Sequence, residues 1–253
     1  MSTMAKKRTP VSPVSPRQNQ ILEALPATDY ARLAPDLQLI PMPQGLVLYE
    51  SGADMHYVYF PTTSIVSLTY VLKNGATGET AVAGNEGVIG ISLFMGGDNS
   101  PSRAVVKSAG EGYRLHANIL KQEFARGSQL RYLALRFAQS LIVQMSQTVA
   151  CNRHHTVDQQ LCRLLLLSLD RLSTNELVMT HELIANMLGV RREGVTEAAN
   201  KLQQDGLISY KRGHIAVVDR PKLEKRVCEC YAVLKKEYDH LFLATPNNSD
   251  FQR

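Results

Sequence analysis

The spacing of apolar residues changes twice along this chain of 253 residues. Between residues 37 and 115 it consists of short runs rich in Val, Ile, Thr and Tyr, separated by turns such as Asn74-Gly75 and Gly96-Gly97. Such runs predict short strands, and their number favours an antiparallel sandwich or barrel. The predicted strands include residues 46–49, 57–60, 64–72, 77–83, 103–107 and 111–115.

Helical spacing begins after His116 and predicts a short helix, followed by a long helix that Ser128 can cap. Along the long helix, an approximate a/d seam for a second subunit consists of Leu130, Ala134, Phe137, Leu141, Gln144 and Thr148. A second apolar flank consists of Leu133, Leu135, Ile142 and Met145. One flank can cover the barrel while the other meets a partner, or both can be the core of a single chain.

Residues 180–207 have the pattern of two short helices joined by a tight turn. Thr180 is a candidate N-cap for the first helix, and Gly189 can take the left-handed backbone that the turn needs. A second helix is expected from about residue 191 to 205, because Val195, Ala198 and Leu202 form an apolar stripe. Strand, turn and strand follow at 207–218. This order predicts a winged helix-turn-helix.

The polar side of the second predicted helix has the chemistry that a DNA groove requires. Arginine can bridge O6 and N7 of guanine, and glutamate can accept from the cytosine amino group. Cations in the hairpin turn would attract the phosphate backbone. The predicted DNA-binding residues are Thr180, Arg191, Arg192, Glu193, Thr196, Glu197, Asn200, Lys211 and Arg212. An ordinary helical pair with solvated charges is the alternative, but two helices, a Gly turn and a basic hairpin in one order favour DNA binding.

Net charge supports a polyanionic partner. The chain carries a formal charge of +5, and residues 191–226 contain nine Lys or Arg against five acids, which leaves +4 in this segment. Prolines 10, 13 and 16 stand where a signal peptide would be apolar, and the longest apolar run, 164–167, is too short to cross a bilayer. We therefore expect a cytoplasmic protein without a membrane partner.

Barrel, long helix and winged helix in this order resemble the catabolite-activator and fumarate-nitrate-regulator (Crp/Fnr) family of bacterial transcription regulators, over about residues 18–220. Residues 189–195, Gly-Val-Arg-Arg-Glu-Gly-Val, are similar to the family's Gly-x-Ser-Arg-Glu-Thr-Val. The resemblance implies a homodimer on a palindromic double-stranded DNA operator, with Arg192 and Glu193 as the base-contacting pair and RNA polymerase as a further partner. Glu197 stands where cyclic-AMP-responsive members commonly have another Arg, so their preferred operator need not transfer.

A second resemblance concerns the family's phosphate-binding cassette, to which residues 90–94 and 102–106 are similar. Ile91 occupies the position of the glutamate that holds the ribose hydroxyl, and an unpaired hydroxyl costs roughly 1–3 kcal/mol. Arg103 lies one position late for the phosphate role. Cyclic AMP is therefore not expected, and the small-molecule effector is unknown. The candidate ligand-pocket residues are Gly90, Ile91, Ser92, Arg103 and Ala104.

The cysteines predict reduced thiols rather than disulfides or a cluster. No cysteine precedes Cys151, as a fumarate-nitrate-type iron–sulfur cluster would require. The spacing of Cys151, His154, His155 and Cys162 fits no common zinc module. Cys228 and Cys230 can be a redox or metal pair, but small buried thiols are the default. We therefore expect no metal and no cofactor.

Together these patterns predict an α+β protein: a jelly-roll barrel of the cyclic-nucleotide-binding type, a long dimerisation helix and a C-terminal winged helix-turn-helix. The expected parts are a disordered basic tail 1–16, a sensory barrel 17–127, a dimerisation helix and hinge 128–153, a DNA-binding domain 154–220 and a helical extension and tail 221–253. No Gly-rich phosphate loop, HExxH or nucleophile elbow indicates an enzyme. The alternative to a DNA-binding regulator is a regulatory ligand-binding subunit that uses the winged helix for protein contacts.

Overall fold

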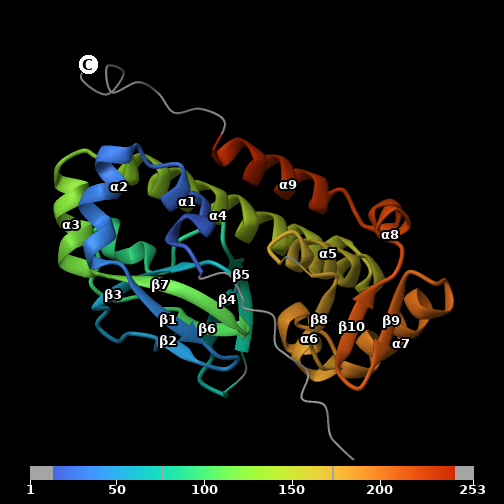
Figure 1. Ribbon diagram of the computed structural model, residues 1–253. Coiled ribbons are helices and arrows are strands. Elements are labelled where there is room, and N and C mark those ends of the chain that lie inside the picture. The colour runs from blue at the N-terminus through green and yellow to red at the C-terminus, as the bar shows by residue number, and fades with distance from the viewer. Residues whose placement is uncertain (1–13, 76, 173, 243–253) are drawn as a thin grey trace, which may run out of the picture.

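Two lobes joined by one long helix make up the computed structural model, which describes residues 14–75, 77–172 and 174–242 (Figure 1). The N-terminal lobe contains the β-sheets, and the C-terminal lobe contains the helix-turn-helix and its wing. Helix α4 (Gln129–His154) extends across the top of the first lobe toward the second. No helix in the described ranges is long and apolar enough to cross a membrane.

Two antiparallel sheets form the N-terminal lobe. One has the order β2 (Val47–Tyr49), β6 (Arg103–Ser108), β4 (Ile65–Val71), β5 (Thr77–Ala83). The other has the order β1 (Gln38–Met42), β7 (Gly110–His116), β3 (Tyr57–Pro61). Apolar side chains such as Phe60, Leu68, Val106 and Leu115 fill the core between the sheets. The sheets do not close on each other, so the expected barrel is an open two-sheet arrangement, and β1 adds to the predicted strands.

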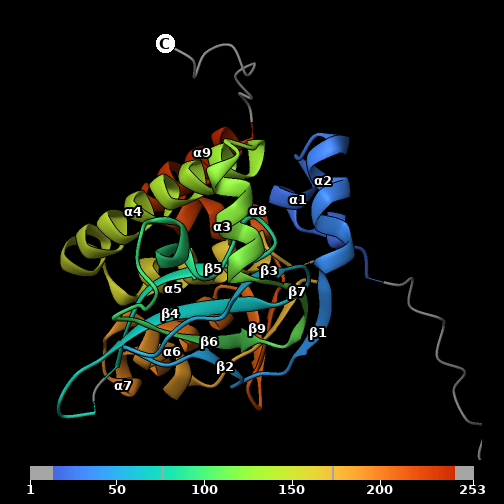
Figure 2. The ribbon, with the colours of Figure 1, turned by 90° about the vertical axis from the view of Figure 1, so that its left-hand side faces the viewer.

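Short helices flank these sheets (Figure 2). Helices α1 (Gln20–Glu23) and α2 (Ala27–Leu33) are separated at Pro26, which precedes the first residue of α2. Asn19 is fully buried and caps α1, while its amide donates to the carbonyls of Pro61 at 2.9 Å and Gly87 at 2.8 Å. Three short 3-10 helices, η1 (Pro16–Gln18), η2 (Ala34–Asp36) and η3 (Ile91–Phe94), and helix α3 (Ala117–Ala125) complete the lobe. Of the predicted basic tail, residues 1–13 lie outside the described residues.

Helix α4 buries most of the residues that the sequence analysis assigned to a dimer seam. Phe137 lies against the β-lobe, where a Cβ on Gly87 would lie 2.2 Å from its ring. Gln144 accepts from the backbone N–H of Val82 at 2.6 Å, and Thr148 is half-buried. The seam prediction is therefore wrong for the five residues that a single chain buries, because other elements of the same chain, including strand β5, pack against α4. These residues are Leu130, Ala134, Phe137, Leu141 and Gln144.

The C-terminal lobe contains α5 (Val157–Leu169), α6 (His181–Leu188) and α7 (Arg192–Gln204), with a sheet of order β8 (Glu176–Val178), β10 (His214–Val217), β9 (Ile208–Lys211). Strand β8 was not predicted. The helical extension expected within 221–253 consists of two helices, α8 (Arg220–Arg226) and α9 (Cys230–Leu241), because the chain turns at residues 227–229 to bury Cys228 and Cys230. Helix α9 then packs along α4 (Figure 1).

Candidate nucleic-acid interface

Local sequence signals set the geometry of the helix-turn-helix. The Thr180 hydroxyl accepts from the backbone N–H of Leu183 at 3.2 Å and so caps α6. Gly189 ends the helix with φ 66°, a left-handed conformation in which a side chain would be strained. Helix α7 begins three residues later. Both helices lie within one residue of their predicted bounds. The tight turn at Gly189 sets the direction in which α7 leaves α6.

One face of α7 is buried and the other is largely exposed. Its apolar stripe packs against the lobe core through Val195, Ala198, Ala199 and Leu202. The opposite face exposes five of the predicted DNA-binding residues: Arg191, Arg192, Glu193, Glu197 and Asn200. These side chains take part in no ion pair within the described residues. Their charges and amides therefore remain available to a partner.

Thr196 differs from its predicted neighbours because the protein itself engages its hydroxyl. The hydroxyl donates to the Arg192 carbonyl at 3.1 Å and lies 2.9 Å from Nδ1 of His181. The His181 ring stacks on Tyr210 of β9, with centroids 4.2 Å apart. Thr196 is therefore placed as an internal link between α6 and α7, rather than as a free base contact. Sequence reasoning missed His181 and Tyr210, because no local spacing connects residues that lie on α6 and β9.

The wing is a tight hairpin with two cations at its tip. Arg212 and Gly213 have φ 52° and 83°, as a two-residue type I′ turn requires, and Lys211 pairs with His214 across it. Lys211 and Arg212 are both exposed. Arginine in the left-handed region costs about 1–2 kcal/mol, and residues that keep such a cost concentrate at functional sites.

The predicted ligand-pocket residues do not form one site. Arg103 lines a cavity of about 270 Å³ between β6 and α6, together with Lys107, Glu79 and Met187. Gly90, Ile91 and Ser92 do not line this cavity, since they lie at η3, and Ala104 is buried in the lobe core. Strand alternation separates Arg103 from Ala104, because neighbouring residues on β6 face opposite sides of the sheet.

Charged groups around this cavity are already paired. Arg103 Nε lies 3.0 Å from a carboxylate oxygen of Glu50, and Lys107 Nζ lies 3.2 Å from one of Glu79. Burial lowers the pKa of Lys107, and the Glu79 carboxylate opposes that shift. The positive charges of Arg103 and Lys107 at this cavity are therefore balanced by carboxylates of the same chain.

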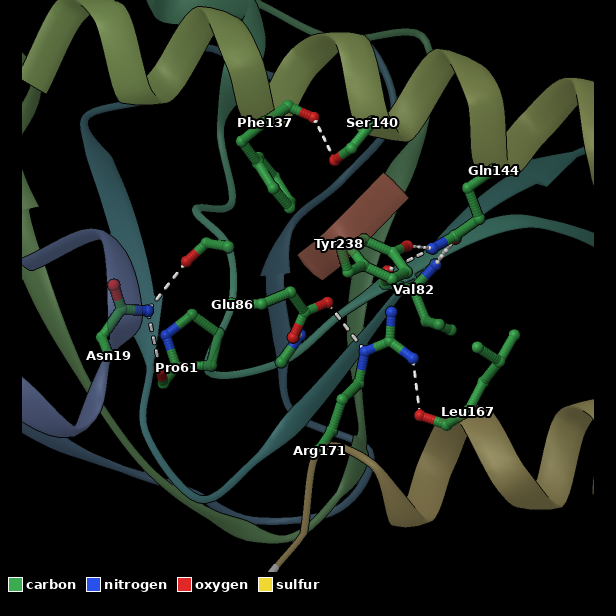
Figure 3. Close-up of polar contacts among 12 residues, drawn as sticks. Asn19, Pro61, Val82, Glu86, Phe137, Ser140, Gln144, Leu167, Arg171 and Tyr238 are labelled. Atoms are coloured by element: carbon green, nitrogen blue, oxygen red, sulfur yellow. Dashed lines mark hydrogen bonds and ion pairs between the residues drawn. The ribbon is translucent and has the colours of Figure 1, made fainter. Parts of the chain in front are cut away.

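A buried polar network connects the two lobes (Figure 3). Arg171, just after α5, lies 2.7 Å from the carboxylate of Glu86 and donates to the Leu167 carbonyl at 2.6 Å. Its guanidinium carbon lies 5.0 Å from the centre of the Tyr238 ring on α9. Gln144 of α4 bonds to the Tyr238 hydroxyl. Four separate segments therefore meet at one point, which fixes the DNA-binding lobe against the β-lobe.

Fold and exposed face together define a winged helix-turn-helix protein with a β-rich N-terminal lobe. Residues 159–226 match the family model of the Crp-like helix-turn-helix domain. A comparison with curated proteins finds no match. The chain therefore contains a Crp-like helix-turn-helix domain in its C-terminal lobe.

Solved structures of Crp/Fnr-type regulators and related proteins share this fold over most of the chain. A transcriptional regulator described as a putative Crp/Fnr member, from Eubacterium rectale, is 18% identical with a TM-score of 0.64, over 83% of this chain and 98% of that one. FixK2 from Bradyrhizobium japonicum is 16% identical with a TM-score of 0.63, over 76% and 98%. The c-di-GMP responsive regulator CLP from Xanthomonas campestris is 16% identical with a TM-score of 0.60, over 77% and 100%. At these identities the likeness concerns the fold alone.

Proposed function

We propose that the chain acts as a homodimeric, sequence-specific regulator that binds a palindromic double-stranded operator through α7. The observation that carries the proposal is the exposed, unpaired face of α7 beside the cationic wing. Arg192 and Glu193 lie in the first turn of α7, where a recognition helix meets base edges. Arg191, Lys211 and Arg212 would contact phosphates.

An exposed apolar stripe on α4 supports the homodimer. Leu135, Ile142 and Val149 are 45%, 53% and 70% exposed, and each follows the previous one by seven residues. A seven-residue repeat keeps such side chains on one line of a helix, as in a coiled-coil seam. Leu135 and Ile142 belong to the second flank that the sequence analysis kept open. A two-fold axis along this stripe would let two copies of α7 enter successive major grooves, about 34 Å apart.

An effector would act where the lobes meet. Helix α6 packs on β5, and the cavity between them includes Arg103, Lys107 and Met187. A small molecule that separates these surfaces would change the freedom of the helix-turn-helix. Because both cations are paired with carboxylates, an anionic nucleotide of the kind named for CLP would have to displace an ion pair. We do not assign cyclic AMP, and RNA polymerase remains a further proposed partner.

Selection of bound sites from random double-stranded DNA by the full chain tests the proposal. We expect a palindrome, an affinity that falls steeply with salt, and protection by a dimer. Lys236→Ala is the matched control for Lys211→Ala, because Lys236 is an exposed cation on α9, away from α7 (Figure 1). Lys211→Ala should reduce the salt slope by about 1, while Lys236→Ala should not change it. Selection of no sequence, with wing variants that bind DNA normally, would favour a ligand-binding subunit that uses the wing for protein contacts.

A further inference from the structure

Four side chains with metal-ligating atoms converge where the end of α4 meets the break between α8 and α9. They are Cys151, His155, Cys228 and Cys230, and their sulfur and ring-nitrogen atoms all lie within 4.8 Å of one another. Sγ of Cys151 lies 3.7 Å from Sγ of Cys228, and Sγ of Cys230 lies 3.5 Å from Nδ1 of His155. The group joins two segments more than seventy residues apart, so it is a product of the fold.

We propose that these four residues bind a single zinc ion in tetrahedral coordination. Zn–S bonds of about 2.3 Å and Zn–N bonds of about 2.0–2.1 Å place tetrahedral ligand atoms roughly 3.8 Å apart for two sulfurs and roughly 3.5 Å apart for sulfur and nitrogen. The separations of 3.7 Å between Sγ of Cys151 and Sγ of Cys228, and 3.5 Å between Sγ of Cys230 and Nδ1 of His155, agree with these values. Three cysteines with one histidine are also a common donor set of structural zinc sites.

Iron–sulfur clusters fit this group less well. In a cluster the protein sulfurs bind different iron atoms, so the ligands surround a multi-atom body rather than one ion. Donor atoms that all lie within 4.8 Å of one another leave space for one ion. A disulfide needs two sulfurs about 2.05 Å apart, whereas Cys151 and Cys228 are 3.7 Å apart and free.

Neighbouring polar groups complete the site. Nε2 of His155 lies 3.3 Å from a carboxylate oxygen of Glu229, an arrangement that orients a histidine whose other nitrogen binds zinc. The Gln147 amide donates to Sγ of Cys230 at 3.0 Å, which would stabilise a thiolate there. The three cysteines are buried, whereas the side chain of His155 is 17% exposed and leaves a path for the ion.

The same geometry corrects the sequence-based grouping of Cys151 and His155 with His154 and Cys162. His154 is exposed, and neither His154 nor Cys162 belongs to the convergent group. Cys162 is nonetheless fully buried and free, so it is a matched control for the zinc ligands.

Zinc at this position would fix the exit of the chain into the DNA-binding lobe. His155 is the C-cap of α4, and α5 begins two residues later at Val157. The ion would tie this exit to the start of α9, which returns along α4. The zinc site does not depend on the DNA-binding proposal, since it rests on residues away from α7.

Metal analysis of the full-length chain, purified with a thiol reductant and without chelator, tests the site. We expect about one zinc ion per chain by mass spectrometry of the elements, and cobalt substitution should give the intense visible bands of a tetrahedral site with a sulfur-to-cobalt charge-transfer band. Cys228→Ser with Cys230→Ser should remove zinc, and Cys162→Ser should retain it. Glu229→Gln should weaken zinc binding roughly 10- to 100-fold in chelator competition.

Three results would overturn the proposal. They are wild-type protein without zinc, zinc that persists in the double variant, and an octahedral cobalt spectrum. A disulfide between Cys151 and Cys228 in reductant-purified, zinc-free protein would assign the pair to redox chemistry instead. If the double variant does not fold, the cobalt spectrum of the wild type and the Glu229→Gln titration still decide, because neither needs a cysteine to be removed.

Discussion

The buried junction between the lobes and the exposed face of α7 both contain charged residues, but they use them in opposite ways. At the junction Arg171 is paired with Glu86 and lies over the ring of Tyr238, whose hydroxyl bonds to Gln144. On α7 Arg192 and Glu193 are exposed. Paired, buried charge holds two lobes in one arrangement, whereas unpaired, exposed charge is available to a ligand. Helix α4 repeats this contrast with apolar residues, since Phe137 is buried and Ile142 is half exposed.

The contrast on α4 predicts the largest effects. Phe137→Glu would place a carboxylate in the core of a single chain, at a cost of several kcal/mol, and should leave the chain unfolded. Ile142→Glu should give a folded monomer, because it places like charges in the proposed subunit contact only. Circular dichroism and light scattering on both variants measure this. A folded Phe137→Glu protein would show that this face of α4 is not core, and a dimeric Ile142→Glu protein would move the interface elsewhere.

The second-largest effect is expected from removing one partner of the buried ion pair between Arg171 and Glu86. Glu86→Gln should lower the free energy of unfolding by about 3–5 kcal/mol, because the Arg171 guanidinium stays buried without a countercharge. The control is Glu23→Gln, which breaks an exposed pair with Arg17 and should cost at most about 1 kcal/mol. Urea denaturation of both variants compares the pairs. Equal losses would mean that burial at the junction does not determine the strength of this pair.

On the exposed face, Arg192→Ala should cost about 1–3 kcal/mol at its own base pair and relax base preference there. Lys211→Ala should weaken binding to all sequences alike, because a phosphate contact carries no sequence information. Titrations on operator variants separate the two effects. An equal loss on specific and random DNA for Arg192→Ala would remove this residue from base recognition.

At the wing tip, Arg212→Asn should raise the free energy of unfolding by up to about 1 kcal/mol, because Asn tolerates the left-handed backbone. The same change should weaken DNA binding through the lost cation. Lys211→Asn is the matched control, since Lys211 has no positive φ and should bring no gain in stability. Thermal unfolding measures the change in stability of both variants, and DNA titration measures their change in affinity. A destabilised Arg212→Asn protein would mean that the arginine side chain makes a stabilising contact.

The smallest effect concerns pH. Burial, followed by the positive charge of Arg192, lowers the pKa of His181 below its ordinary value. The stabilisation from neutral His181 is therefore present above about pH 6.5 and is lost as pH falls from there through the lowered pKa. Nε2 of His181 is buried without a partner, so protonation would add an unpaired N–H. The stability difference between wild type and His181→Phe should shrink between about pH 8 and about pH 5. A difference that does not change with pH would contradict this role.

The helix-turn-helix could be predicted from sequence because its signals are local. Thr180, Gly189 and the stripe around Val195 determine the two helices within one short segment. The face of α4 that meets the β-lobe could not be chosen in this way, since both flanks are apolar and only the packing of distant elements, such as β5, distinguishes them. The group around Cys151 and Cys228 depends on a helix break at residues 227–229 that apolar periodicity does not indicate.

Two neighbouring residues in the loop after β5 connect this loop to both α4 and the end of α5. Gly87 lies against the Phe137 ring of α4, where even a methyl group would collide, and Glu86 holds Arg171 at the end of α5. A rigid displacement of this loop cannot leave both α4 and the DNA-binding lobe in place. Movement of the β-lobe would therefore reach the proposed dimer helix through Phe137 and the end of α5 through Arg171.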